Sequence, residues 1–322
     1  MRVAVAELGS RAVRLLIADA RDDALFPVRT STRQIDLASA FAHPDSSVAK
    51  AAVTAVGRII SEFRGEAANH RASRFASFGT AAIRTLAERH PALVSQIDRD
   101  LVVLTGAQEA ECSFVAAVTD EDVGARSGLQ YVVIDVGRGS SEIIAGRIAG
   151  GRPFVSHHIS CEMGSKKLSD ELSKCSHDFE TFDRQIEQEL SSIDIPQPGV
   201  GAKTLLLGSV PTKAAWLQVR SSPLERYDPK KVGGATLERD TFADASEKLL
   251  AAWRRDPVAA RRFVDDRIPD DSEIDMVMGG LRFLDLVLTR QKRRNCTVSS
   301  RGTRFGFAYK LAAEIGASPS NS

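Results

Sequence analysis

Short apolar runs alternate with longer amphipathic stretches along this chain. Runs rich in Val, Ile, Leu or Phe predict β-strands at residues 2–6, 14–18, 74–78, 101–104, 131–135, 142–146 and 204–207. Helical periodicity predicts helices at residues 48–64, 107–118, 178–192, 240–255 and 273–289. Strands that alternate with helices are typical of an α/β fold with partly parallel sheets.

The chain also contains an internal repeat. The segment VAELG at residues 5–9 is echoed 128 residues later by VIDVG at residues 133–137. A second apolar segment follows each copy, so each predicts a hairpin with an acidic residue and a glycine at its turn. We interpret the pair as a duplicated two-lobed architecture with a ligand in the cleft.

The chemistry of such turns favours phosphate and Mg²⁺. Glycine lets backbone N–H groups approach phosphate oxygens closely, and a neighbouring carboxylate can hold a hard cation. The alternative is two ordinary glycine turns with surface carboxylates, because glycine signals alone are weak.

Composition narrows the choice of function. The 322 residues, 43% hydrophobic and 26% charged, are enough for two globular domains. Lys and Arg total 43 against 42 Asp and Glu, which argues against a general nucleic-acid binder. The sequence shows neither a secretory signal nor an apolar run of about 18 residues, and its four cysteines lack metal-site spacing. We therefore expect a reduced, cytoplasmic protein without a membrane or nucleic-acid partner.

Seven short motifs follow one another over nearly the whole chain. Residues 7–15 (ELGSRAVRL) are close to D-x-G-S-N-S-x-R-L, 80–84 (TAAIR) to T-S-A-x-R, 106–110 (GAQEA) to G-x-x-E-A, and 135–142 (DVGRGSSE) to D-I-G-G-G-S-T-E. Residues 163–165, 207–210 and 298–304 fall at L-G-S, G-G-T and V-S-x-x-G-L-R. In this order the motifs resemble the exopolyphosphatase/guanosine pentaphosphatase (Ppx/GppA) phosphatase family of the acetate kinase, Hsp70 and actin superfamily.

The resemblance implies a fold and a boundary. It implies an α/β protein of two actin-like lobes with an interdomain cleft, of the short type without an appended C-terminal helical domain. We expect the N-terminal lobe at residues 1–118, to which the C-terminal helix at 306–322 could return, and the C-terminal lobe at 119–305. It also makes a homodimer plausible.

The resemblance further implies hydrolysis of a phosphoanhydride in polyphosphate or in guanosine penta- or tetraphosphate, with Mg²⁺ as cofactor. Glu109 matches the catalytic glutamate and would be the general base, while Arg84 would neutralise developing charge. Asp135, Glu142 and Glu7 would serve the metal. The expected phosphate-binding residues are Gly9, Ser10, Arg11, Gly137, Arg138, Gly139, Ser140, Gly208 and Ser209.

Each catalytic or metal assignment has a plainer alternative. A glutamate in the first turn of a helix, such as Glu109, is favoured by the helix dipole alone. Asp135 at a strand end is a common turn residue, and Arg84 could pair with any surface carboxylate. The basic stretches at 254–255, 261–262 and 290–294 could follow a polyanion or simply be solvated helix ends.

The departures from the family pattern fall on the loops that should bind phosphate. Glu7 replaces aspartate, Arg11 and Ala12 replace Asn and Ser, Ala81 replaces Ser, Arg138 replaces the middle glycine, and Ser209 and Val210, followed by Pro211, replace Gly-Thr. Arginine binds phosphate strongly, so one hypothesis is that binding persists with altered turnover.

The competing hypothesis is a catalytically silent member that binds an anion or nucleotide, or acts as a scaffold. In that case Arg138 would fold into the cleft and pair with Glu109 or Asp135. A small-molecule kinase of the same superfamily is a third alternative, against which the G-x-x-E-A segment and the motif order argue.

Overall fold

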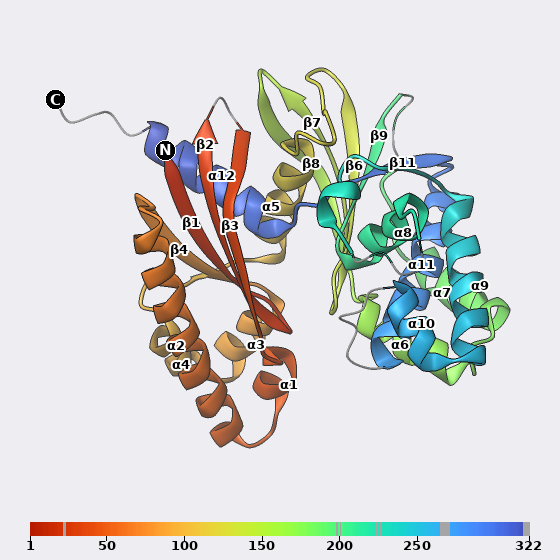
Figure 1. The fold of residues 1–322 in the computed structure, drawn as a ribbon, viewed down its shortest axis with the longest axis horizontal. Helices are drawn as coiled ribbons and strands as arrows, with labels where there is room; N and C mark the ends of the chain where they lie inside the picture. Colours follow the sequence, from red (N-terminus) through yellow and green to blue (C-terminus); the bar gives the residue numbers. More distant parts are fainter. Residues whose placement is uncertain are drawn as a thin grey trace. The chain divides into compact units, whose positions relative to one another are not determined.

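The chain forms two compact units, each built on its own mixed β-sheet (Figure 1). The computed structural model describes residues 1–21, 24–197, 199, 201–222, 225, 227–264 and 271–317. The first unit comprises Met1–Thr119 with Thr303–Ser322, and the second comprises Asp120–Gly302. Within the described ranges, no helix is long and apolar enough to cross a membrane.

The first unit contains a five-stranded sheet in the order β3-β2-β1-β4-β5. Its strands are β1 (Arg2–Leu8), β2 (Ala12–Arg21), β3 (Ala24–Gln34), β4 (Arg74–Gly79) and β5 (Val102–Val103). Its helices are α1 (Leu37–Ala42), α2 (Ser46–Asn69), α3 (Ala81–Arg89), α4 (Pro91–Ile97), α5 (Gly106–Val118) and α12 (Thr303–Ala317). Strands β1 to β3 form an antiparallel meander, and β4 joins β1 in parallel.

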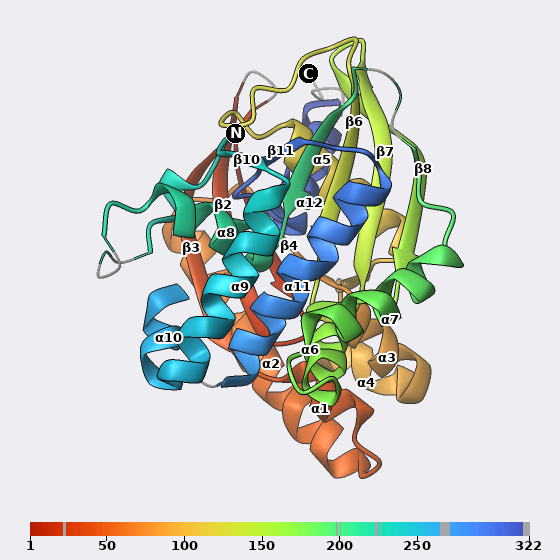
Figure 2. The ribbon, with the colours of Figure 1, turned by 90° about the vertical axis from the view of Figure 1, so that its right-hand side faces the viewer.

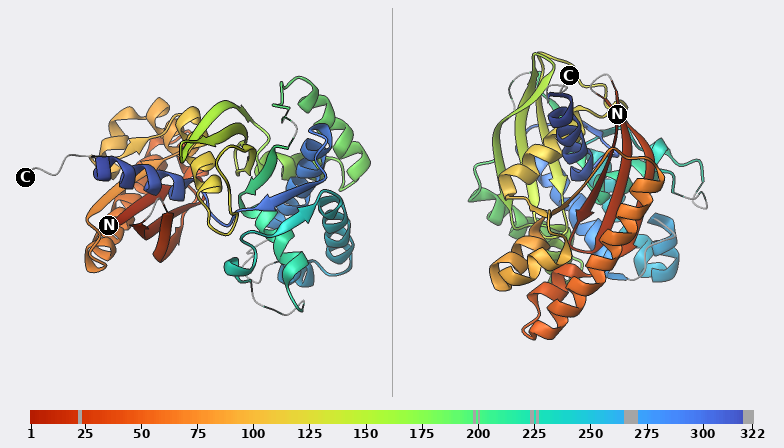
Figure 3. Two further views of the ribbon diagram at one scale, coloured as in Figure 1. Left: turned by 90° about the horizontal axis from the view of Figure 1, so that it is seen from above. Right: turned by 90° about the vertical axis from the view of Figure 1, so that its left-hand side faces the viewer.

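One face of the first sheet is buried because apolar residues occupy alternate positions of its central strands, including Ala4, Ala6 and Leu8 of β1. One core joins these to α2 side chains such as Val56 and Phe63. Helices α5 and α12 pack together, and α12 also contacts β1 and β2. Both views of Figure 3 place α12 beside the red strands of this sheet.

The second unit contains a six-stranded sheet in the order β10-β11-β9-β6-β7-β8. Its strands are β6 (Gln130–Val136), β7 (Ser141–Ala149), β8 (Arg152–Cys161), β9 (Lys203–Leu207), β10 (Thr236–Glu238) and β11 (Asn295–Val298). Its helices are α6 (Ser165–Lys174), α7 (Phe179–Ser191), α8 (Ser209–Val219), η1 (Pro229–Lys231), α9 (Asp240–Arg255), α10 (Pro257–Val264) and α11 (Asp271–Arg290). Figure 2 shows α9 and α11 running side by side over this sheet.

The two sheets confirm the internal repeat. In each, a three-stranded antiparallel meander is followed by a parallel strand that pairs with the first strand of the meander: β1-β2-β3 with β4, and β6-β7-β8 with β9. The outer strands β3 and β8 were not predicted from the sequence. Their burial patterns explain why: most of their residues are exposed or half-buried, so neither strand has a clear apolar alternation.

Candidate functional site

The predicted site residues lie in two groups, one in each unit, where parallel strands end. In the first unit β1 and β4 end together, with Leu8 paired to Gly79. In the second unit β6 and β9 end together, with Asp135 paired to Leu207. The loops that leave parallel strands at this edge of a sheet are the usual ligand-binding loops of α/β folds.

The β1–β2 turn carries Gly9, Ser10 and Arg11 and is held by its backbone. The Gly9 N–H donates to the Ala12 carbonyl at 3.0 Å. The carbonyls of Ser10 and Arg11 accept N–H groups from the segment that follows β3, both at 3.0 Å. These bonds involve no side chain, so the turn keeps its form without the Asn and Ser of the family pattern.

Glu7, predicted to serve the metal, faces two cations. It lies directly opposite Arg14 in the β1–β2 pair. Its Oε2 is 4.0 Å from Arg14 Nη1 and 3.6 Å from Arg304 Nη1 of α12, and the Glu7 side chain is only 12% exposed. Burial lowers the pKa of the Arg304 guanidinium, and Glu7 opposes that shift. Because two guanidinium groups repel a divalent cation, Glu7 does not fit the role of a Mg²⁺ ligand.

Arg84 and Glu109, the two predicted catalytic residues, form an ion pair. Arg84 Nη1 of α3 donates to Glu109 Oε2 at 2.8 Å and to the Leu104 carbonyl at 2.9 Å. Glu109 stands in the first turn of α5, whose N-terminus is closed by a reciprocal capping box of Thr105 and Gln108. The Glu109 side chain is 18% exposed. It is therefore fixed in direction, with part of its surface open to water.

The β6–β7 turn, residues 137–140, is held against the start of α6. The carbonyls of Gly137 and Arg138 accept the backbone N–H groups of Ser165 and Lys166 at 2.9 and 3.0 Å. A Cβ added to Gly164 would lie 2.3 Å from the Arg138 carbonyl oxygen. The turn thus has a fixed backbone, and glycine at 164 is what lets α6 approach it.

Arg138 adopts an ordinary backbone conformation, since it is not among the residues with positive φ. Its side chain contacts α11. The Nη1 atom lies 3.2 Å from the Met276 sulfur and 3.7 Å from Glu273 Oε1. Arginine in place of the middle glycine therefore does not force the turn into a strained conformation.

Asp135 and Glu142 lie directly opposite each other in the β6–β7 pair, so their side chains share one face of the sheet. Glu142 is 6% exposed, and its Oε1 accepts the hydroxyls of Ser140 and Ser160 at 2.6 and 3.1 Å. Two like charges in direct opposition are unfavourable without a compensating cation.

The donor chemistry of this pair is compatible with Mg²⁺. The described part of the chain contains no group of three or more His, Cys, Asp or Glu residues that could enclose a metal ion. Mg²⁺ commonly binds through only one or two carboxylates and takes its remaining ligands from water and substrate phosphates. Asp135 and Glu142 fit a metal held in that manner.

Gly208 brings the β9–α8 loop against the same strand end. Its φ of 99° lies in the region that favours glycine, and an added Cβ would be 2.7 Å from the Val136 carbonyl and 3.4 Å from Asp135 Oδ1. Ser209 begins α8, whose start has no side-chain cap. The structure thus brings together Asp135, the β6–β7 turn and Gly208. Pro211 supplies no N–H at this helix start.

Several contact residues were missed in the sequence. Arg14 and Arg304 belong to the quoted motifs, which could have indicated an anionic partner, but only the structure shows that this partner is Glu7. Glu273 and Met276 lie far from Arg138 in the chain and belong to no motif. Their contact with the turn depends entirely on how α11 packs.

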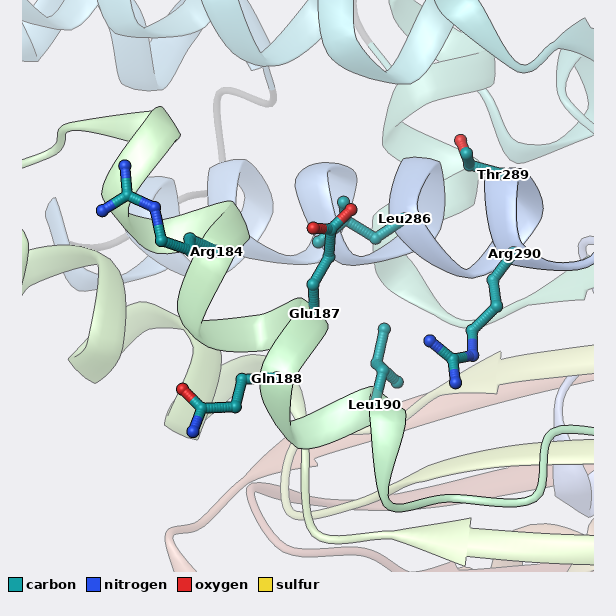
Figure 4. A pocket seen from close by; sticks show the side chains of 7 residues that line it. All are labelled: Arg184, Glu187, Gln188, Leu190, Leu286, Thr289 and Arg290. Atoms are coloured by element: carbon teal, nitrogen blue, oxygen red, sulfur yellow. The ribbon is translucent and has the colours of Figure 1, made fainter.

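A surface pocket of about 520 Å³ lies between the C-terminal halves of α7 and α11 (Figure 4). It is lined by Arg184, Glu187, Gln188, Leu190, Leu286, Thr289 and Arg290. Leu286 is ten residues beyond Met276 on α11, about 15 Å along the helix axis. The pocket is therefore separate from the β6–β7 turn. Arg290 of the basic stretch lines it, whereas the side chain of Arg262 lies outside the described residues.

Sequence comparisons identify relatives of this chain. The model of the Ppx/GppA phosphatase family matches residues 16–314. Exopolyphosphatase 2 of Mycobacterium tuberculosis is 25% identical over 97% of this chain and 98% of its own length. An uncharacterised protein of Streptomyces coelicolor is 33% identical, over 53% of this chain and 50% of that protein.

Solved structures agree with the fold. A Ppx/GppA family member from Aquifex aeolicus superposes with a TM-score of 0.77 at 22% identity, over 99% of both chains. An exopolyphosphatase from Cytophaga hutchinsonii gives a TM-score of 0.70 at 20% identity, over 98% of both chains. The predicted α/β fold of two actin-like lobes is confirmed.

Proposed function

Because this chain belongs to the Ppx/GppA phosphatase family, we propose that it is a Mg²⁺-dependent phosphoanhydride hydrolase that releases orthophosphate from the end of inorganic polyphosphate. The observation that carries the proposal is the 2.8 Å ion pair of Arg84 and Glu109, which fixes the direction of the expected general base and leaves its side chain partly exposed. Guanosine penta- and tetraphosphate contain the same kind of bond and are the alternative substrates.

The proposed reaction is one in-line displacement. A water attacks the terminal phosphorus, and Glu109 accepts its proton. The P–O bond to the bridging oxygen breaks, its electron pair stays on the shortened chain, and orthophosphate leaves. Arg84 holds the Glu109 carboxylate in position and offsets negative charge that builds up beside it.

The two turns have different proposed roles. Backbone N–H groups of the β6–β7 turn and of the start of α8 bind phosphate oxygens. Asp135 and Glu142 would hold Mg²⁺, which when bound neutralises phosphate charge. In the first unit, Arg14 and Arg304 surround Glu7 and supply positive charge without a metal.

The test is orthophosphate release from long-chain polyphosphate and from guanosine pentaphosphate, each with Mg²⁺. Glu109→Gln keeps the shape and the Arg84 contact but removes the base, so we expect release to fall by about 10²–10⁴-fold. Glu111→Gln is the matched control, because Glu111 lies on the same helix and pairs with Lys310 instead. Equal release by both variants would contradict the role of Glu109.

An anion-binding protein without turnover is the second candidate. It is favoured by Glu7, whose two arginine neighbours leave the first turn without a metal-binding carboxylate. In that case neither wild type nor variant releases orthophosphate, while polyphosphate still raises the melting temperature in a saturable manner. Loss of both release and stabilisation would leave only a scaffold role.

A further inference from the structure

Arg138 is the residue that adds charge to the β6–β7 turn, and α11 holds its side chain. The ionic contact with Glu273 is 3.7 Å long, and the neighbouring contact is to the Met276 sulfur, a weak acceptor. The side chains of Arg138 and Glu273 are 21% and 22% exposed. Water therefore reaches this pair, which makes it an exchangeable contact rather than a sealed one.

The side chain of Arg138 can change partners without moving the backbone of the turn. The backbone of the turn is fixed by the start of α6, which binds the carbonyls of Gly137 and Arg138 and packs against them through Gly164. A rotation of the long arginine side chain leaves those bonds intact. Phosphate oxygens compete well for a guanidinium, because the contact is charge-assisted and can be bidentate.

We propose that Arg138 is a reserve phosphate ligand and that Glu273 sets the affinity for polyphosphate by competing for it. The proposal rests on the proposed function in one respect, which is that the β6–β7 turn binds phosphate. A phosphate ligand must displace Glu273 from Arg138 before it can bind that side chain. Its apparent dissociation constant is therefore the intrinsic constant divided by the fraction of molecules in which Arg138 is already released. Glu273 is thus a residue that tunes affinity without touching the substrate.

The test measures the dissociation constant of tripolyphosphate by calorimetry, without added metal and in the Glu109→Gln background. Glu273→Gln removes the competitor, so we expect binding to tighten by about three- to fivefold. Arg138→Gly removes the ligand, so we expect weaker binding. In the Arg138→Gly background, Glu273→Gln should no longer change the constant.

Glu171→Gln controls for the change in net charge. Glu171 is 21% exposed, close to the 22% of Glu273, and it also pairs with a cation, Lys174 rather than Arg138. It should leave tripolyphosphate binding unchanged. The proposal is overturned if Glu273→Gln fails to tighten binding, if the tightening persists without Arg138, if Glu171→Gln tightens binding equally, or if no variant binds tripolyphosphate.

The failures of this inference and of the proposed hydrolysis can be told apart. Binding is measured here without turnover. If the wild type releases no orthophosphate, the hydrolase proposal is refuted, but the comparison of the Arg138→Gly and Glu273→Gln single variants with the double variant still tests the competition. Conversely, an active hydrolase in which the Glu273→Gln effect is independent of Arg138 would refute only the competition.

Discussion

The first turns of the two units occupy the same place in the same fold, yet they carry opposite electrostatics. In the β1–β2 hairpin, Glu7 stands opposite Arg14 and also meets Arg304. In the β6–β7 hairpin, the equivalent positions hold two acids, Asp135 and Glu142. The first carboxylate faces two cations of its own unit, whereas the second pair places two carboxylates side by side, the donor arrangement that a hard cation prefers.

The difference shows how a duplicated unit divides its chemistry. Both turns follow a central strand that is buried over most of its length, so packing requirements keep the hairpins alike. The charged residues beside the turns are freer to differ, since none of them belongs to the two hydrophobic cores. One position across the pair, Arg14 against Glu142, is enough to convert the proposed metal-binding arrangement into an acid paired with a base.

The largest expected effect concerns the metal. Asp135→Asn removes half of the acidic pair, so we expect the Mg²⁺ concentration for half-maximal orthophosphate release to rise about tenfold or more and the maximal rate to fall about 10²-fold. Glu7→Gln should leave the Mg²⁺ requirement within about twofold of wild type. A titration of orthophosphate release against Mg²⁺ gives the half-maximal concentration and the maximal rate of each variant. Equal shifts of the half-maximal Mg²⁺ concentration in the two variants would contradict the proposed difference between the turns.

Stability should change in opposite directions. Glu7→Gln leaves two partly buried guanidinium groups without their carboxylate, and we expect it to cost about 1–3 kcal/mol. Asp135→Asn relieves a like-charge pair, and without metal we expect a gain of about 0.5 kcal/mol. Urea unfolding in the absence of Mg²⁺ compares them, and changes of the same sign would argue against this electrostatic account.

An effect confined to acid pH is expected at the open end of the first hairpin. There Arg2 and Asp19 are cross-strand partners, and the hydrogen bond from Arg2 lowers the pKa of Asp19 from 3.8 to about 2, with burial opposing it. Because the folded pKa lies below the unfolded one, this stability is complete above about pH 4 and is lost as pH falls toward 2. The second hairpin has Gln130 opposite Arg147 and no such acid.

Acid titration of the urea midpoint tests this pair. Between pH 4 and pH 2, wild type should lose about 1 kcal/mol more than Asp19→Asn, after allowance for solvent screening at a pair that is 32% and 15% exposed. Parallel losses in the two proteins would show that other carboxylates account for the acid sensitivity of the first unit.

Much of the fold could be predicted from the sequence because buried helices and strands have a strong periodic pattern of apolar residues. The predicted helix at 240–255 coincides with α9, and the predicted strand at 131–135 lies within β6. Strands β3 and β8 were not predicted, because they form the outer edge of each meander and most of their residues are exposed or half-buried. The order of motifs indicated the family, and the repeated acidic-x-Gly segment indicated the duplication. The predicted cytoplasmic location and homodimer stay predictions.

The site shows what the sequence by itself determined and what tertiary structure alone decided. The repeated acidic-x-Gly segments marked Asp135 and the two glycine turns, because turn and strand-end chemistry is local, whereas Glu109 was marked by the resemblance of its motif to the family pattern. The partners are not local. The pairing of Arg84 with Glu109, the enclosure of Glu7 by Arg304, and the contact of Arg138 with Glu273 all join elements distant in the chain. The sequence determines which side chains are charged, but packing of the helices on the sheets determines which charges meet. That packing decides whether a carboxylate faces a cation, is held in one direction or lies beside another acid.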